Sequence, residues 1–499
     1  MAVPLVAIGD SLTQGMTHGS IYKTEIAYPN LIAPCLSEEG FNRPDFTGEG
    51  GIPLNIESIL RLLEKRVGSR IHWYEVPAAV QVILETLDKT EDYWERGDGS
   101  KPFQPDLRHH NLAISGLQLG DCDTLTEAIC SQELQNRKQP QWLPSGLRRL
   151  TANWNWDDNF LNQIPTLPLY RNTRRTLNCS FDQQYTSFSQ ITSAQHLADS
   201  QGGIENLIFW LGSNNCLGTV TGLEIKPSTK DDIDKLPHQR TCNLWEVDHF
   251  KTLLDRIVPK IALIGAQNVF VGTIPHVTIP PVTRGVSPGK RDFEARNSRG
   301  YYDFYTHFWI WDDDFDPDKP DKHPRLNAEE AELIDHNIDG YNDLIREMAQ
   351  KQGWYVVDIC KALDQLAYRR QASQVTYPFP PGLSAALQKY QPRRVSSSGQ
   401  PLIDTRFLRI FEGGNVAGGL IGLDGFHPTP VCYGLIAHEF MEVMKQADVT
   451  VNQPADWWDR VVLSDTILMD MPESLGYLQE TLNFLENRTP LLRLLRLWN

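Results

Sequence analysis

The hydrophobic residues of this chain fall into short continuous runs that alternate with segments of helical spacing. Continuous apolar runs bounded by glycine or polar residues are typical of buried strands. The predicted strands are residues 3–8, 206–211, 268–274 and 354–358. A shorter run, HNLAISG at 110–116, ends in a Ser-Gly turn and is predicted to be a further strand.

Between these runs, apolar residues recur three and four positions apart, which predicts helices. The predicted helices cover residues 27–39, 56–67, 77–94, 121–130, 246–266, 326–352 and 431–446. Strands that alternate with helices indicate a parallel sheet covered on both faces. The hydrophobic pattern therefore predicts an α/β fold around a central parallel sheet.

Four stretches interrupt this alternation and are predicted to be large insertions. They cover about residues 17–110, 131–203, 275–324 and 371–420. Those around 131–203, 275–324 and 371–420 are expected to be irregular, because Pro, Asn and Gly break any persistent period. We expect one domain at 1–447 that carries the insertions, followed by a C-terminal extension at 448–499. Within that extension, the apolar-basic segment 491–498 is expected to dock on the protein's own surface.

Composition narrows the possible partners and compartment. The 499 residues include 47 Lys and Arg against 63 Asp and Glu, a net charge of −16, which disfavours nucleic acid and anionic membranes as partners. No apolar run approaches the ~20 residues of a transmembrane span. The chain opens directly into its first strand, so we expect no signal peptide. The eight cysteines form no C-x-x-C pair and are expected to be reduced and buried, as in a cytoplasmic protein.

The first predicted strand leads into Gly9-Asp10-Ser11-Leu12. In open α/β sheets, ligands and reactive groups lie at the carboxyl ends of the strands. A serine there is a nucleophile only if the chain also supplies a base, a carboxylate and donors for an oxyanion. Asp424 and His427 are three residues apart in a glycine-containing loop, so the carboxylate can orient the imidazole and leave Nε2 free to accept the proton of Ser11.

Three groups are candidate donors to the oxyanion that forms when a serine attacks a carbonyl. The first is the backbone N–H of Ser11 itself. Gly116 offers a second N–H with no Cβ to block the substrate oxygen, and Asn214 offers a side-chain amide at the end of a buried strand. The catalytic set is therefore predicted to be Ser11, Asp424 and His427, with Ser11, Gly116 and Asn214 as the oxyanion hole.

Taken in order, these stretches resemble the sequence blocks of the SGNH hydrolases, the GDSL family of serine esterases and lipases. The matching segments are GDSL at 9–12, NLAISG at 111–116, GSNN at 212–215 and DGFHP at 424–428. Asn215 departs from the family pattern, which has Asp there. The resemblance implies a flavodoxin-like three-layer α/β/α sandwich with a central parallel sheet and, in this long chain, large loop insertions.

The resemblance implies a hydrolase that cleaves carboxylic esters through an acyl-enzyme on Ser11. The expected partner is a small-molecule ester, with lipids and acylated sugars among the candidates, and the chemistry requires neither a metal nor an organic cofactor. Two alternatives stay open: an acyltransferase in which an alcohol outcompetes water, and a binding protein that keeps the fold without activity. The sequence leaves the oligomeric state open.

A second serine also sits in a hydrolase-like motif. Residues 285–289, GVSPG, match the G-x-S-x-G pattern of another hydrolase fold. That motif requires a strand before the serine and a helix after it. Because Pro288 follows Ser287 directly, we expect this stretch to be a loop.

Overall fold

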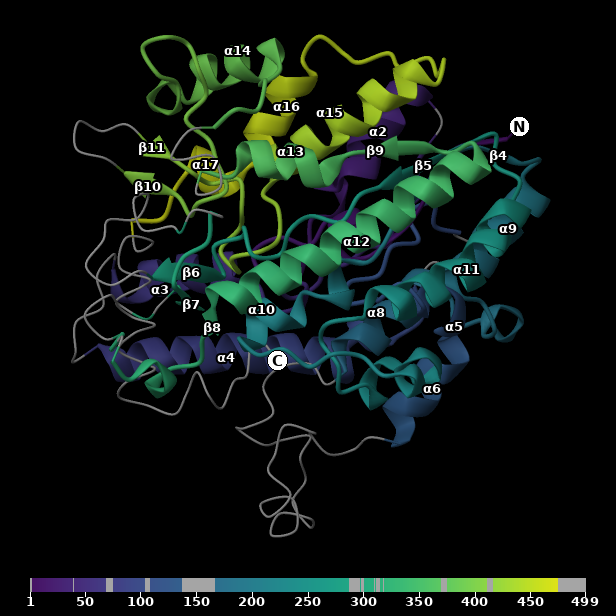
Figure 1. The fold of residues 1–499 in the computed structure, drawn as a ribbon, viewed down its shortest axis with the longest axis horizontal. Coiled ribbons are helices and arrows are strands. Elements are labelled where there is room, and N and C mark those ends of the chain that lie inside the picture. Colours follow the sequence, from purple (N-terminus) through teal and green to yellow (C-terminus); the bar gives the residue numbers. More distant parts are fainter. Residues whose placement is uncertain are drawn as a thin grey trace.

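The structure is a computed structural model with a four-stranded parallel sheet at its centre (Figure 1). It describes residues 2–38, 40–68, 75–103, 108–136, 167–286, 297, 300–308, 310, 315–316, 318–368, 375–410 and 416–473. The strands lie in the order β1 (Val3–Gly9), β4 (Ile204–Trp210), β5 (Asn268–Gly272) and β9 (Tyr355–Val357), and each neighbouring pair is parallel. The predicted α/β class with a parallel sheet is confirmed.

Residues 110–114 lie alongside β1 at its other edge. The N–H of Ala7 donates to the carbonyl of His110 and its carbonyl accepts from Leu112 N–H, both at 2.9 Å, while Ile114 N–H donates to Gly9 at 3.1 Å. Only the pairing of Ala7 with Asn111 forms a bridge, in parallel sense. The predicted strand is therefore a short parallel contact rather than a full strand.

Alternate side chains of a strand point to opposite faces of the sheet, and here both faces are apolar. Helices therefore cover both faces. Val6 and Ile8 pack into one buried cluster, whereas Leu5 and Ala7 pack into another. The helices of the first cluster include α9 (Gln190–Ser200), α11 (Val247–Leu263) and α12 (Ala328–Gln352). Those of the second include α2 (Tyr28–Leu36), α13 (Ile359–Leu366), α14 (Pro381–Tyr390), α15 (Pro430–Gln446) and α16 (Trp457–Ser464).

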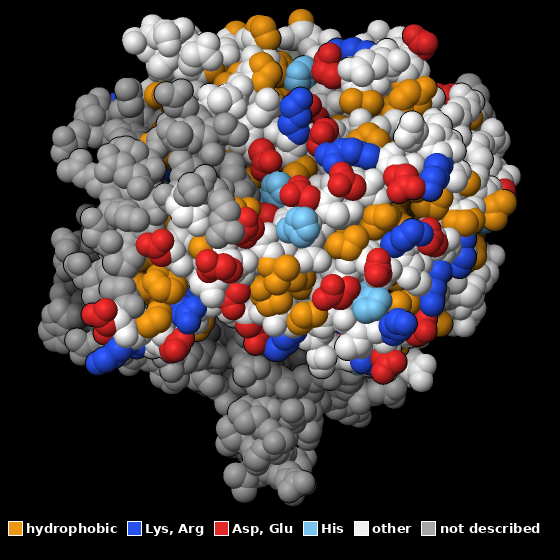
Figure 2. Space-filling model, in the orientation of Figure 1, with side chains coloured by type: hydrophobic (Ala, Val, Ile, Leu, Met, Phe, Trp, Pro, Cys, Tyr) orange, Lys and Arg blue, Asp and Glu red, His pale blue; other side chains and the backbone are white. Residues whose placement is uncertain are grey.

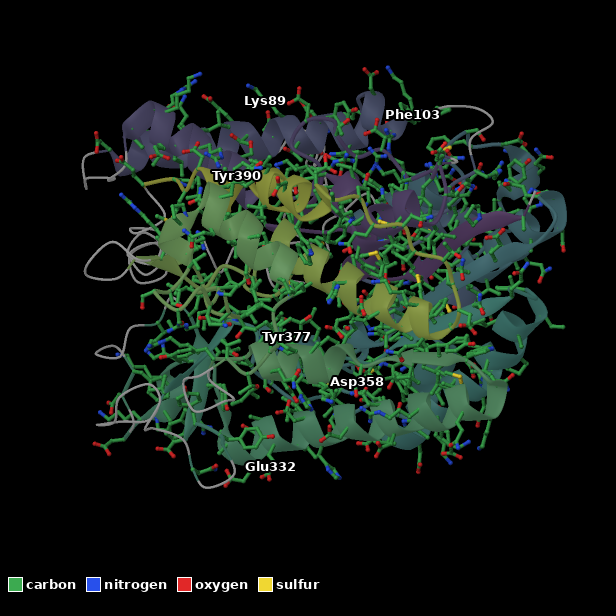
Figure 3. All side chains as sticks on the ribbon, turned by 90° about the horizontal axis from the view of Figure 1, so that it is seen from above. Lys89, Phe103, Glu332, Asp358, Tyr377 and Tyr390 are labelled. Atoms are coloured by element: carbon green, nitrogen blue, oxygen red, sulfur yellow. The ribbon has the colours of Figure 1, made fainter. Side chains whose placement is uncertain are left out.

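The helices with strong apolar spacing are found close to their predicted positions. Helix α3 (Ile56–Val67) has the predicted bounds, and α4 (Val76–Glu95) is one residue longer at each end. Helix α11 continues through Pro259. The helix expected at 121–130 is instead two helices, α5 (Asp121–Thr124) and α6 (Glu127–Asn136). Figure 3 shows α4, marked by Lys89, and α12, marked by Glu332, on opposite sides of the molecule.

The expectation of irregular insertions is wrong for much of their described length. Residues 168–177 form α8 (Pro168–Leu177), whose buried positions include Asn172, Thr173, Arg175 and Thr176, so hydrophobic spacing could not reveal it. The same insertion contains α9, the insertion at 371–420 contains α14, and paired short strands lie within or next to the other insertions. These strands are β2 (Ser20–Ile21), β3 (Ile52–Pro53), β6 (Thr283–Val286), β7 (Phe304–His307), β8 (Leu326–Asn327), β10 (Arg409–Ile410) and β11 (Val416–Ala417).

Two predictions fall partly or wholly outside the described residues. The loop expected at 285–289 begins inside β6, because Gly285 and Val286 are strand residues, while Ser287 lies outside the described part. The segment 491–498 also lies outside it. Before that point, α16 and α17 (Thr466–Met469) contribute buried side chains such as Trp457 and Leu468 to the same cluster as α15.

The burial of the cysteines agrees with the expectation from composition. All eight cysteines are buried and free, as predicted. Figure 2 shows acidic and basic side chains interspersed over the face that carries α11 and α12. Within the described residues, every helix is too short or too polar to cross a membrane.

Candidate functional site

Ser11 is the first residue of α1 (Ser11–Gln14), a single helical turn directly after β1. Asp10 caps this turn, since its Oδ1 accepts a hydrogen bond of 3.0 Å from the N–H of Leu12. A Cβ at Gly9 would lie 2.1 Å from Thr13 Oγ1, so the tight turn requires glycine at that position. The local sequence thus presents Ser11 at the carboxyl end of a central strand.

His427 and Asp424 form a buried hydrogen-bonded pair. His427 Nδ1 lies 2.8 Å from Asp424 Oδ2. The carboxylate also accepts from the backbone N–H groups of Gly19 at 2.5 Å, Phe426 at 3.1 Å and His427 at 3.0 Å. Burial opposes ionisation, but the adjacent His427 and these hydrogen bonds hold the pKa of Asp424 below its usual value. A charged Asp424 therefore orients the imidazole with its proton on Nδ1.

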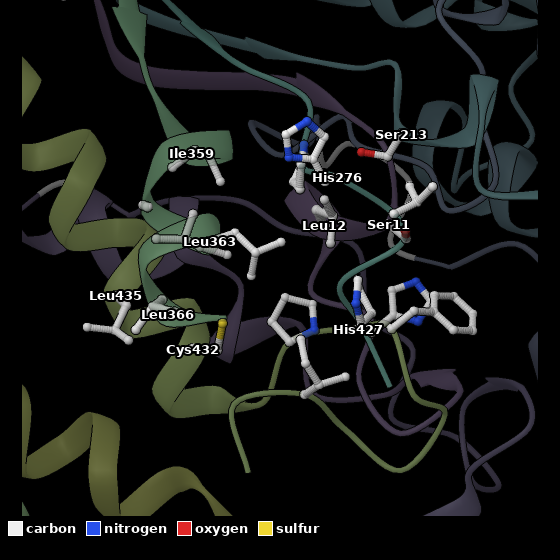
Figure 4. A pocket seen from close by; sticks show the side chains of 18 of the residues that line it. Ser11, Leu12, Ser213, His276, Ile359, Leu363, Leu366, His427, Cys432 and Leu435 are labelled. Atoms are coloured by element: carbon white, nitrogen blue, oxygen red, sulfur yellow. The ribbon is translucent and has the colours of Figure 1, made fainter. Parts of the chain in front are cut away.

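Ser11 and His427 line one cavity, which has an empty volume of about 830 Å³ including space open to solvent. Figure 4 shows these two residues on one side of the cavity and Leu363, Leu366 and Leu435 on the other. Among the described residues, Ser11 Oγ has no hydrogen-bonding partner. Ser11 and His427 thus lie on the same cavity, although no hydrogen bond joins their side chains in this structure.

The far wall of the cavity is apolar and helical. Helices α13 and α15 each present side chains three and four residues apart toward it, as expected for facing helix surfaces. They are Ile359, Ala362, Leu363 and Leu366 on α13, and Cys432, Leu435, Ile436 and Glu439 on α15. The acidic side chain in this set, Glu439, accepts a hydrogen bond from Tyr377 on one of its oxygens. The cavity therefore suits an apolar group.

Asn214 lies in the turn after β4, lines the cavity and connects two other segments. Its Nδ2 donates to the carbonyl of Leu117 at 2.9 Å and lies 3.4 Å from Asp10 Oδ2. Gly116 precedes Leu117 and has a positive φ of 87°. Gly116 is exposed and is not among the residues that line the cavity. Within the described part of the chain, the N–H groups of Ser11 and Gly116 have no hydrogen-bond acceptor.

The sequence did not reveal a buried amide network behind Ser11. Gln14 Oε1 accepts from the N–H of Ser115 at 2.8 Å and from Asn172 Nδ2 at 2.8 Å. Gln14 Nε2 in turn donates to Asn172 Oδ1 at 2.7 Å. The network fixes the turn before Gly116 relative to α1. In the sequence, the only sign of this network is the run of polar residues that forms α8. Hydrophobic spacing does not show that such residues are buried.

Asp10 has an unusual ionisation. Burial raises its pKa from 3.8 to about 7, and the hydrogen bond from Leu12 and the nearby His427 compensate only in part. The carboxyl is 2% exposed. Near neutral pH, a buried carboxyl next to Ser11 is thus part of the time protonated and part of the time charged.

Asp10→Asn is expected to stabilise the protein more at pH 8 than at pH 5. Between pH 3.8 and about 7 the folded protein retains a proton that the unfolded chain has lost, so the wild type loses stability as pH rises through this window. The asparagine is neutral throughout and can still accept from Leu12. The gain in free energy of unfolding should grow by roughly 2–3 kcal/mol between the two pH values. Urea unfolding at both pH values measures it, and a constant difference would contradict the raised pKa.

Another titratable cluster adjoins the same cavity. His276 lines it, with Nδ1 at 2.9 Å from Asp364 Oδ1 and Nε2 at 3.2 Å from Asp339 Oδ1. Burial opposes protonation, but the hydrogen bonds to Asp339 and Asp364 raise the pKa of His276 to about 12. Cys360 Sγ lies 3.6 Å from His276 Nδ1. The three side chains His276, Cys360 and Asp364 have the donor types of a metal site.

The structure therefore brings Ser11, His427, Asp424 and Asn214 together from three loops at one edge of the sheet. Gly116 lies one residue from the Leu117 carbonyl that Asn214 binds. Comparison with protein-family models, curated proteins and solved structures finds no match to this chain.

Proposed function

We propose that this protein is a serine hydrolase that cleaves carboxylic esters, with Ser11 as nucleophile. The observation that carries the proposal is the shared cavity: Ser11 and His427 line it, and His427 is oriented by a buried, ionised Asp424. Acyl transfer to serine requires a hydroxyl as nucleophile, an imidazole as base and a carboxylate that orients the imidazole.

In the proposed reaction, Ser11 Oγ attacks the ester carbonyl while His427 Nε2 accepts the hydroxyl proton. Collapse of the tetrahedral intermediate breaks the bond to the alcohol, which leaves with the proton from His427. A water then attacks the acyl-enzyme, with His427 again as base, and releases the acid and Ser11. The proposed oxyanion donors are the N–H groups of Ser11 and Gly116 and the amide of Asn214. Asn214 Nδ2 donates to Leu117 and Asp10 in this structure, so it must release one of these hydrogen bonds, of which the 3.4 Å contact with Asp10 is the longer.

We propose further that the chain is an SGNH hydrolase with a flavodoxin-like sandwich. The order of parallel segments across the sheet supports this: residues 110–114, β1, β4, β5 and β9 follow the flavodoxin-like sequence 2-1-3-4-5 in chain order. Helices on both faces agree with it. The free, buried cysteines support a reducing compartment such as the cytoplasm.

The apolar wall favours an ester with an apolar acyl chain over a short or charged one. Across p-nitrophenyl esters of increasing chain length, kcat/KM is expected to rise about fourfold per methylene until the cavity is filled. Initial rates on the acetate, butyrate, hexanoate and octanoate esters measure this, with the Ser11→Ala protein as background. Turnover no greater than that background would contradict the proposed function.

Asn214→Ala is expected to lower kcat by roughly 10²–10³ with little change in KM, because a donor to the oxyanion acts mainly in the transition state. The same variant should lose some thermal stability, since the 2.9 Å hydrogen bond to Leu117 is also lost. Asn215→Ala is the matched control: Asn215 Oδ1 accepts from Leu119 at 2.9 Å, but Asn215 does not line the cavity. If both variants lose stability and keep kcat, Asn214 is only structural.

A further inference from the structure

A second group of side chains converges at the carboxyl edge of the sheet, between the neighbouring strands β5 and β9. His276 follows β5, while Cys360 and Asp364 lie one turn apart on α13, which follows β9. One donor atom from each of the three lies within 4.8 Å of the other two. Imidazole, thiol and carboxylate thus come together from the loop after β5 and from helix α13.

The backbone that carries these side chains is held in place from both sides. Thr273 Oγ1 accepts from the N–H of Cys360 at 2.9 Å and donates to Asp358 Oδ1 at 3.0 Å. Asn342 accepts from Ile274 N–H at 2.7 Å and donates to its carbonyl at 2.9 Å. The loop after β5 and the start of α13 are therefore fixed relative to each other before any ligand binds.

We propose that His276, Cys360 and Asp364 bind a zinc ion. Zinc prefers nitrogen and sulfur ligands and accepts carboxylate, and bonds of about 2.0–2.3 Å place tetrahedral ligand atoms about 3.3–3.8 Å apart. Nδ1 of His276 is 3.6 Å from Cys360 Sγ and 2.9 Å from Asp364 Oδ1, so small side-chain shifts suffice. The ion replaces the protons on Nδ1 and on the thiol, and water completes the tetrahedron.

Asp339 occupies the position of an outer-shell partner. Its Oδ1 lies 3.2 Å from Nε2 of His276, the ring nitrogen that faces away from the proposed ion. Histidines that bind metals usually donate this second N–H to a carboxylate, which fixes the ring and strengthens the ligand. The structure thus supplies three protein ligands for the ion and a carboxylate that orients the histidine among them.

The cluster is accessible to solvent, and its soft ligands favour zinc over Mg²⁺ and Ca²⁺. The side chain of Asp364 is 29% exposed and that of Asp339 is 61% exposed, which opens the cluster to solvent while Cys360 stays buried. A thiolate and an imidazole disfavour Mg²⁺ and Ca²⁺, which prefer oxygen ligands. The ion would join the loop after β5 to α13, which forms one wall of the cavity. Zinc binding by these three side chains does not require that the protein hydrolyse esters.

The test is metal binding by the chelator-treated full-length protein. We expect one equivalent of Zn²⁺ by calorimetry and, with Co²⁺ as probe, a near-ultraviolet thiolate-to-cobalt charge-transfer band. Cys360→Ser should abolish the band and weaken zinc binding at least about a hundredfold, and Asp339→Asn should weaken it about 10- to 100-fold. Cys432→Ser is the matched control, because Cys432 is a buried thiol of the same cavity outside the cluster, and it should bind as the wild type.

Asp364→Asn provides a second variant in case Cys360→Ser does not fold, because Asp364 is partly exposed. It should weaken zinc binding by a similar factor. It should still fold in chelator, with a lower melting temperature because His276 loses a carboxylate partner. Two results would overturn the proposal: no stoichiometric zinc binding by the wild type, or zinc and cobalt binding that Cys360→Ser and Asp364→Asn leave unchanged. In the second case the ion binds elsewhere, for example at the acidic group Asp88, Glu91 and Asp92 on α4.

Discussion

Ser11→Ala is expected to reduce kcat for ester hydrolysis by roughly a millionfold, to the residual rate that substrate binding and the oxyanion hole support. The variant loses the only atom that forms the acyl-enzyme in the proposed reaction. Its melting temperature should stay that of the wild type, because Ser11 Oγ has no hydrogen-bonding partner among the described residues. Initial rates on p-nitrophenyl esters and a thermal melt on one preparation measure both quantities.

Ser213→Ala is the matched control for this result. Ser213 lines the same cavity as Ser11 (Figure 4) and should be replaceable with little loss of rate. Wild-type turnover by Ser11→Ala would show that another group is the nucleophile, and Ser287 in the G-x-S-x-G stretch would be the next serine to replace.

Asp424→Asn is expected to lower kcat by roughly 10⁴, the effect of replacing the carboxylate of such a triad by an amide. Each oxygen of Asp424 accepts two hydrogen bonds, including those from His427 Nδ1 and Gly19 N–H on Oδ2. An asparagine must turn its NH₂ group toward one of these donor pairs. If the NH₂ takes the Oδ2 position, the imidazole loses its partner or changes tautomer. In either orientation donors face each other, so the loop at 424–427 loses stability as well.

The same substitution at Asp465, a buried acidic residue outside the cavity, separates the effect on kcat from the effect on stability. Asp465 is 1% exposed, accepts from Leu468 N–H at 2.9 Å and does not line the cavity. Asp465→Asn also places an NH₂ group in a buried carboxyl site and should keep kcat. If Asp424→Asn behaves in the same way, with kcat retained, Asp424 has no role in orienting the base.

The strands and helices that could be predicted are those whose buried residues form a continuous apolar run or recur at a regular spacing in the sequence. β1 and β4 are buried along nearly their whole length, so each appears as an apolar run that leads to a candidate residue, Ser11 or Asn214. The pairing of Asp424 with His427 was predictable because the two are only three residues apart. Short spacing in a tight loop leaves few alternative geometries.

The features that could not be predicted depend on polar burial or on contacts between distant loops. Helix α8 buries Asn172 and Thr176, whose partner Gln14 is more than 150 residues away. The raised pKa of Asp10 is a consequence of packing around the turn, which the GDSL motif does not encode. His276 and Cys360 meet only because β5 and β9 are neighbours in the sheet, and no local spacing shows that.

Covalent labelling of the wild-type protein with an organophosphonate, followed by peptide mass spectrometry, tests the central claim most directly. The reagent reacts with a serine only when a base and an oxyanion hole activate it. The account predicts one adduct per chain, located on Ser11, slower labelling of Asn214→Ala and none of Ser11→Ala. An unlabelled wild-type protein, or an adduct on Ser287 with Ser11 unmodified, would contradict it.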